Sequence, residues 1–147
     1  MYKKILVPLD GSSASEAILN HVEQLARCGD AALYFLEVLE PLPQHAAAGA
    51  PSMFAEGAGH RAADIKHYVQ EMAEKFSAKG LNAEALVRRG AIVDTILHTA
   101  DELGVDLIAM ASHGYSGFAR FIYGSVAADV LHRAKAPMLI LRIEPTD

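Results

Sequence analysis

The chain has 147 residues, of which 52% are hydrophobic and 21% are charged, and its formal net charge at pH 7 is -5. This length and composition fit one globular domain with a buried core, and the acidic balance argues against a nucleic-acid-binding surface. No apolar run approaches the roughly 20 residues needed to cross a bilayer, so we expect neither a membrane span nor a signal peptide. Cys28 is the only cysteine, so we expect no internal disulfide and a reducing cytoplasm.

The first part of the chain alternates apolar runs with a helical pattern. Residues 5–8 read as a strand, and residues 32–39, rich in Leu, Tyr, Phe and Val, read as a second strand. Between them we predict a helix with Ser13 as its N-cap, Glu16 reaching back in a capping box, and Gly29 at its end.

The rest of the chain continues this alternation after one interruption. Residues 41–59 are rich in Pro, Ala and Gly and are predicted to be a mobile loop, followed by a long helix over about 60–79. Beyond it we predict strands over 83–88, 106–111 and 137–143 and helices over 92–103 and 125–134.

Five strands that alternate with four helices predict an α/β fold, a single-domain open five-stranded parallel sheet with helices on both faces. Ligands of such sheets bind beyond the carboxyl ends of the strands, where the strand order reverses. Residues 8–13 and 111–125 follow the first and fourth strands. If these two strands are neighbours, both loops meet at one crevice.

The segment after the fourth strand has the features of an anion site. No carboxylate occurs between Leu107 and Ala128, and the segment contains Gly114 and the pair Gly124-Ser125 at the start of a helix. Glycine lets the backbone approach a ligand closely, and the first amides of a helix can point at phosphate oxygens. The alternative is turn punctuation followed by an ordinary N-cap.

Two cationic or titratable residues lie inside the same segment. His113 and Arg120 are candidates for contacts to phosphate, and the alternative for each is a solvated loop position. Asp10 also has two interpretations: a carboxylate that accepts hydrogen bonds from ribose hydroxyls, or an Asx-type turn with Gly11 and Ser12.

The motifs together resemble the nucleotide-binding branch of the universal stress protein family. That branch shows a glycine, two residues, a second glycine, nine residues, and then glycine followed by serine or threonine. Gly114, the nine residues 115–123 and Gly124-Ser125 match this pattern, whereas Ala111 replaces its first glycine. We expect binding to survive this replacement, because φ at a strand end is usually negative. The resemblance extends over nearly the full chain and includes residues 7–12, 35–38, 105–110 and 137–141.

The resemblance implies a Rossmann-like sheet of strand order 3-2-1-4-5, bound ATP with Mg²⁺ or Mn²⁺, and a homodimer that pairs through the C-terminal strand Pro137–Ile143. It places the base against Pro8 and Val38 and the ribose or adenine against Asp10. The nucleotide-binding residues that it implies are Pro8, Leu9, Asp10, Val38, Met110, Ala111, Ser112, His113, Gly114, Gly124, Ser125 and Val126.

The function that follows is an ATP-binding protein with a regulatory role in stress response. We identify no catalytic residue and no metal ligand, and His113 is the sole candidate for a general base. Two alternatives stay open: a dimerisation or interaction module of the same family that does not bind nucleotide, and a slow ATP hydrolase.

Overall fold

The computed structural model describes residues 1–41, 51–112 and 125–143, with the helical backbone alone described over 51–61. Five parallel strands form one sheet, and their order is the predicted one, β3-β2-β1-β4-β5. The strands are β1 (Lys4–Pro8), β2 (Ala32–Leu39), β3 (Asn82–Arg89), β4 (Leu107–Ala111) and β5 (Met138–Leu141). Their ends lie within two residues of the predicted ones.

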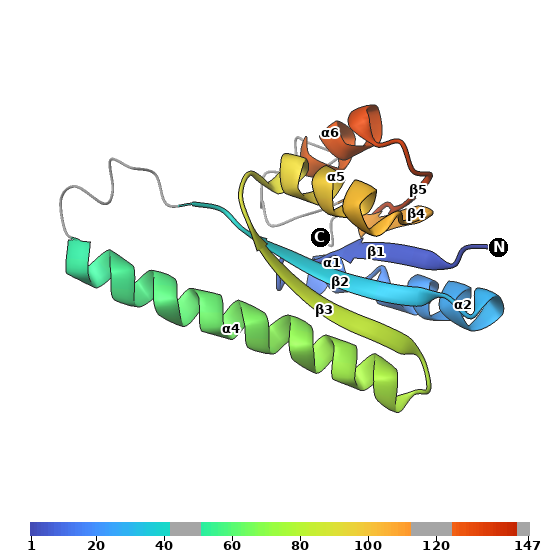
Figure 1. Ribbon diagram of the computed structural model, residues 1–147, viewed down its shortest axis with the longest axis horizontal. Coiled ribbons are helices and arrows are strands. Elements are labelled where there is room, and N and C mark those ends of the chain that lie inside the picture. Colours follow the sequence, from blue (N-terminus) through green and yellow to red (C-terminus); the bar gives the residue numbers. More distant parts are fainter. Residues whose placement is uncertain (42–50, 113–124, 144–147) are drawn as a thin grey trace.

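Helices cover both faces of the sheet and complete a three-layered α/β domain (Figure 1). Helices α1, α2 and α4 lie on one face, and helices α5 and α6 lie on the other. Their bounds are α1 (Ser13–Glu16), α2 (Leu19–Gly29), α4 (Pro51–Ala78), α5 (Ile92–Leu103) and α6 (Ser125–Arg133).

The apolar run of β1 shows how the sequence produces these layers. Successive side chains of a strand point to opposite faces, and a parallel strand is buried on both. Ile5 and Val7 therefore pack into the core beneath α2 and α4, while Leu6 packs into the core beneath α5 and α6. All three side chains are fully buried.

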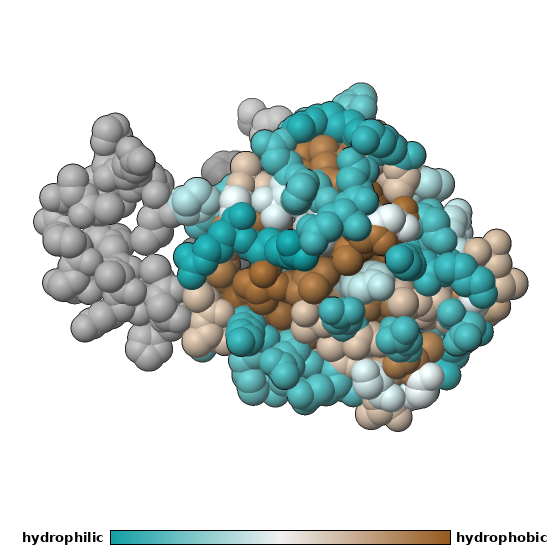
Figure 2. Space-filling view, in the orientation of Figure 1, coloured by the Kyte–Doolittle hydropathy of each residue, from teal (hydrophilic) through white to brown (hydrophobic). Residues whose placement is uncertain are grey.

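The core beneath α5 and α6 reaches the surface near the outer edge of the sheet. Figure 2 shows hydrophobic side chains in a band over β2 and β3, bordered by hydrophilic residues. Leu86, Val93 and Leu97 belong to this core and are half-buried. Helix α5 thus covers this face of the sheet incompletely at the β3 edge.

The first helix differs from its prediction in its cap and in its length. Ser12, with extended backbone, is the N-cap, and its Oγ accepts from the amide of Ser15 at 3.1 Å. Ser13 already lies inside the helix, so the predicted capping box of Ser13 and Glu16 is wrong. The helix stops at Glu16. Helix α2 ends at Gly29 and is followed by its C-cap Asp30, which adopts a left-handed φ of 51°.

The long helix α4 begins nine residues before its predicted start at residue 60. Part of the predicted loop, residues 51–59, is therefore helical. Proline is well suited to the first position of a helix, where its missing N–H costs no hydrogen bond, and Pro51 occupies that position. The rest of the predicted mobile loop, residues 42–50, lies outside the described residues.

Candidate functional site

Strands β1 and β4 are neighbours in the sheet. This adjacency is required if the segments that follow the two strands are to form one ligand-binding site. Ile5 pairs with Leu107 and Leu6 with Ile108. Because both strands run in the same direction, the segment after Pro8 and the segment after Ala111 leave the sheet at the same end. Helix α1, which follows the first of these segments, contacts β4. The strand order also reverses here, because β2 flanks β1 on its other side.

The segment after β1 is held by hydrogen bonds within the chain. The amide of Leu9 donates to the carbonyl of Leu36 at 2.8 Å, and the Leu9 side chain is buried in the core beneath α2 and α4. Asp10 is exposed, and its Oδ1 accepts from the amide of Ser12 at 2.9 Å and from the Ser12 hydroxyl. Gly11 between them has a φ of +81°, a conformation that favours glycine.

This geometry is the Asx-type turn that we weighed for Asp10. The turn does not conflict with a ligand, because a carboxylate has four lone-pair positions and can accept from several donors at once. A second contact fixes the backbone of the turn, since the amide of Asp10 donates to Ser15 Oγ at 3.4 Å. The carboxylate of Asp10 is therefore held at the carboxyl end of β1.

Two further acidic side chains lie around the same turn. Glu37 is the one charged residue of β2 and is only 6% exposed. Its Oε1 would lie 3.8 Å from a Cβ added at Gly11, which places the carboxylate directly beneath the turn. Glu16, at the end of α1, accepts a hydrogen bond of 2.6 Å from the hydroxyl of Tyr68 on α4.

Tyr68 is surrounded by negative charge. Burial, followed by the hydrogen bond to Glu16, raises the pKa of the Tyr68 phenol, and the charges of Glu16, Glu37 and Asp10 raise it further. The phenol therefore stays protonated and acts as a donor. Sequence reasoning missed Glu37 and Tyr68; the available signal was a lone acid inside the apolar run of residues 32–39.

The last two residues of β4 and the first residue after it are buried. Met110, Ala111 and Ser112 are 6%, 8% and 1% exposed. Asp30 is the sole non-glycine residue with a positive φ in the described part of the chain, so the backbone of Ala111 does not require glycine. The amide of Ser112 donates to the carbonyl of Leu141 at 2.8 Å, and Ser112 Oγ accepts from the amide of Ile143 at 3.4 Å.

Some of the remaining predicted site residues are described by the structure, and the others are not. Pro8 is buried at the end of β1, and Val38 and Val126 are half-buried and pack against the same core as Met110. Ser125 is exposed and is the first residue of α6. The others, His113, Gly114 and Gly124, lie outside the described residues.

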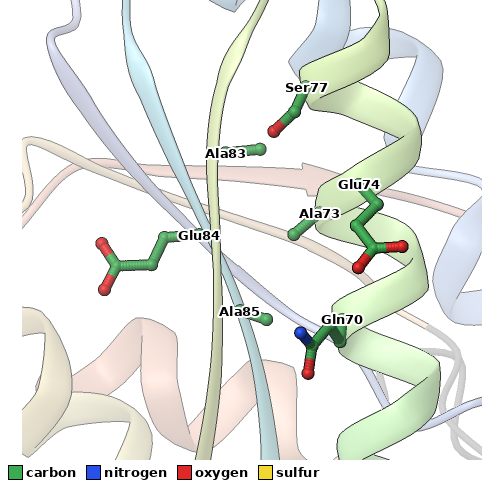
Figure 3. Close-up of a pocket in the computed structure, with 7 residues that line it drawn as sticks. All are labelled: Gln70, Ala73, Glu74, Ser77, Ala83, Glu84 and Ala85. Atoms are coloured by element: carbon green, nitrogen blue, oxygen red, sulfur yellow. The ribbon is translucent and has the colours of Figure 1, made fainter.

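A groove elsewhere in the described structure has a different kind of lining. It has a volume of about 320 Å³ and lies between α4 and β3, and its lining, drawn in Figure 3, contains none of the predicted site residues. Its floor is formed by alanines, and its lining residues are Gln70, Ala73, Glu74, Ser77, Ala83, Glu84 and Ala85. Among the described residues, no three His, Cys, Asp or Glu side chains are placed to hold a metal ion.

The fold and the position of the site define an open, parallel α/β domain with its candidate ligand-binding end at β1 and β4. More specifically, a model of the universal stress protein family matches residues 1–142, and the chain belongs to that family. No helix within the described ranges is both long enough and apolar enough to span a membrane.

Individual relatives match over nearly the whole chain. The universal stress protein MJ0531 of Methanocaldococcus jannaschii is 31% identical over 144 residues, which cover 97% of this chain and 83% of that protein. The solved structure of hypothetical protein MJ0577 matches with a TM-score of 0.85 at 24% identity and covers 99% of both chains. A universal stress protein in complex with cAMP matches with a TM-score of 0.70 at 26% identity, over 97% of this chain and 98% of that chain.

Proposed function

We propose that this protein binds ATP, accompanied by Mg²⁺ or Mn²⁺, and serves as a regulatory nucleotide-binding protein of the cytoplasmic stress response. The observation that carries the proposal is the pairing of β1 with β4, since it brings the Asp10 turn to the same end of the sheet as Ser112, after which the glycine motif follows in the sequence. A solved relative that binds cAMP supports an adenine nucleotide as the ligand.

Electrostatics suggest how the nucleotide would be oriented. Asp10, Glu16 and Glu37 concentrate negative charge at the carboxyl ends of β1 and β2. Phosphate would be repelled there, whereas ribose hydroxyls can donate to Asp10. Residues 107–128 contain no carboxylate, and α6 begins at Ser125 with no acidic residue in its first turn. The phosphates would therefore lie on the α6 side.

The apolar contacts fit the opposite end of the nucleotide. Val38 is half-buried at the end of β2, and Pro8 is buried at the end of β1. These two residues would form a hydrophobic wall against the base, whereas Met110 would lie at the entry to the phosphates and Val126, the second residue of α6, at the phosphate end. A divalent cation would be held chiefly by the triphosphate oxygens, where it neutralises their charge, rather than by a cluster of protein ligands.

We propose binding rather than turnover, because His113 is the sole candidate base in the glycine segment. A slow hydrolase is the second candidate, since a positioned triphosphate with its metal already supplies part of the chemistry of hydrolysis. Steady-state phosphate release separates the two. Rapid release by the wild type that disappears in Gly124→Asp would favour the hydrolase.

We also propose a homodimer formed through β5. This strand pairs with β4 on one side and is the edge of the sheet. Its four residues, Met138–Leu141, are apolar and only half-buried. An apolar edge strand offers unpaired backbone donors and acceptors to a second chain.

Mass spectrometry of denatured protein tests the nucleotide proposal. Wild-type protein purified without added ligand is expected to release adenine nucleotide, and Gly124→Asp is expected to release none, because its carboxylate would repel phosphate. Asn82→Asp is the matched control: it adds the same charge at the exposed amino end of β3 and should leave the released nucleotide unchanged. Equal release from all three proteins would contradict the placement of phosphate at Gly124.

A further inference from the structure

The hydrogen bond between Tyr68 and Glu16 joins two elements that are 52 positions apart in the sequence. Tyr68 comes from α4, is half-buried and packs against the core beneath that helix. Glu16 ends the single turn of α1. The carboxylate that the sequence pattern assigned to a capping box is thus used to attach α1 to α4.

A short series of hydrogen bonds leads from this attachment to Asp10. The amide of Glu16 donates to the carbonyl of Ser12 at 3.3 Å. Ser15 Oγ donates to that same carbonyl at 2.9 Å and accepts from the amide of Asp10. The amide of Ser12 in turn donates to Asp10 Oδ1 at 2.9 Å. The Asp10 turn and α1 therefore behave as one hydrogen-bonded unit.

Contacts with the rest of the fold hold this unit in place. A helix of four residues is marginal by itself, because nucleation fixes several residues for a single hydrogen bond, and the two residues that follow it continue in helical conformation into α2. Gly11 adds backbone freedom at the turn itself. The carboxylates of Asp10, Glu16 and Glu37 also repel one another, whereas the Tyr68 hydroxyl donates a hydrogen bond to one of them, Glu16.

We propose that Tyr68 is a positioning residue for the ribose of the bound nucleotide: acting through Glu16, it holds the α1 turn so that Asp10 faces the ribose hydroxyls. The inference rests on the proposed nucleotide binding and assigns a specificity role to a residue of α4. Loss of the Tyr68 hydroxyl should therefore impair the recognition of ribose more than the recognition of base or phosphate.

The test compares ATP with 2′,3′-dideoxy-ATP, which keeps base and phosphates but lacks both ribose hydroxyls. Wild-type protein is expected to prefer ATP by about tenfold or more, the usual worth of a hydrogen bond to a charged acceptor. Tyr68→Phe should reduce this preference severalfold, and Asp10→Ala should abolish it. Tyr34→Phe is the matched control, because it removes a phenol hydroxyl from the opposite core and should keep the wild-type preference.

Substitutions at Glu16 separate positioning from a general loss of structure. Glu16→Gln keeps an oxygen that accepts from Tyr68 and should retain the preference, whereas Glu16→Ala should reduce it severalfold, as Tyr68→Phe does. A purely structural role would lower the melting temperature and weaken both nucleotides equally, so an unchanged preference in Tyr68→Phe and Glu16→Ala would overturn the inference.

Titration of the wild-type protein tests the role of Tyr68 separately from the proposed nucleotide binding. Failure of wild-type protein to bind either nucleotide would contradict the proposed function and, with it, the role of Tyr68. Equal wild-type affinity for the two nucleotides would leave nucleotide binding intact and overturn the ribose role of Asp10 and Tyr68 alone.

Discussion

The amide of Ser112 donates a hydrogen bond of 2.8 Å to the carbonyl of Leu141. This contact continues the β4–β5 ladder by one residue, up to the point where the glycine-containing segment begins. It ties the start of the proposed phosphate-binding segment to the strand that we propose as the dimer interface. The hydroxyl of Ser112 adds a longer contact of 3.4 Å to the amide of Ile143.

Ser112→Ala is expected to destabilise the fold modestly. The substitution keeps the backbone hydrogen bond and removes only the acceptor for Ile143, at a site that is 1% exposed. We expect the free energy of unfolding, measured in urea, to fall by about 0.5–1.5 kcal/mol. Ser77→Ala, at an exposed position of α4, is the control and should change little. Equal effects of the two substitutions would show that the Ser112 hydroxyl contributes nothing.

Ala111→Gly tests the departure from the family's glycine pattern. Because the backbone of Ala111 does not adopt a positive φ, the methyl group does not strain the chain, and ATP affinity should stay the same or rise. Stability should fall by about 0.5–1 kcal/mol, since glycine in a strand loses more backbone entropy on folding. Calorimetric titration and urea unfolding measure the two effects. Markedly weaker binding of ATP would mean that Ala111 contributes to the site in another way.

Stability at alkaline pH should depend on Tyr68. Its pKa in the folded protein is raised above the ordinary value of about 10, so the unfolded chain releases the phenolic proton first. The stabilisation is therefore complete below pH about 10 and is lost as the pH rises through the folded-state pKa. Between pH 9 and about pH 11, the free energy of unfolding in urea should fall more steeply for wild type than for Tyr68→Phe. Parallel declines would contradict the buried, hydrogen-bonded phenol.

Ile140→Lys should convert the proposed dimer into a monomer. Lysine on an edge strand disfavours pairing with a second chain, and Ile140 is half-buried on β5. We expect sedimentation equilibrium to report twice the chain mass for wild type and a single chain mass for the variant. Retention of the dimer by a folded variant would indicate an interface elsewhere.

Much of the fold could be predicted because burial on both faces leaves a plain signature. The continuous apolar run of β1 and the left-handed Gly104 that ends α5 follow from local sequence alone. The choice between Ser12 and Ser13 as N-cap could not, because both side chains have the required chemistry and the backbone conformation decides. The start of α4 does not follow from the sequence pattern, because the proline and glycines of residues 51–59 are typical of a loop.

The site was predictable only in part, for a related reason. The predicted strand order makes β1 and β4 neighbours, and this adjacency is confirmed. It brings Asp10 and Ser112 to one end of the sheet. Tyr68 and Glu16 are 52 positions apart in the sequence, so no local sequence pattern predicts the hydrogen bond between them. The burial of Glu37 likewise depends on the packing of α4 and the Gly11 turn over β2.

Calorimetric titration of nucleotide-free protein with ATP and Mg²⁺ tests the central claim most directly. We expect saturable binding of one ATP per chain, with an affinity that Gly124→Asp abolishes and Asn82→Asp leaves unchanged. No heat of binding up to millimolar ATP, in protein that is folded by circular dichroism, would contradict it. The β1–β4 end would then belong to an interaction module that does not bind nucleotide.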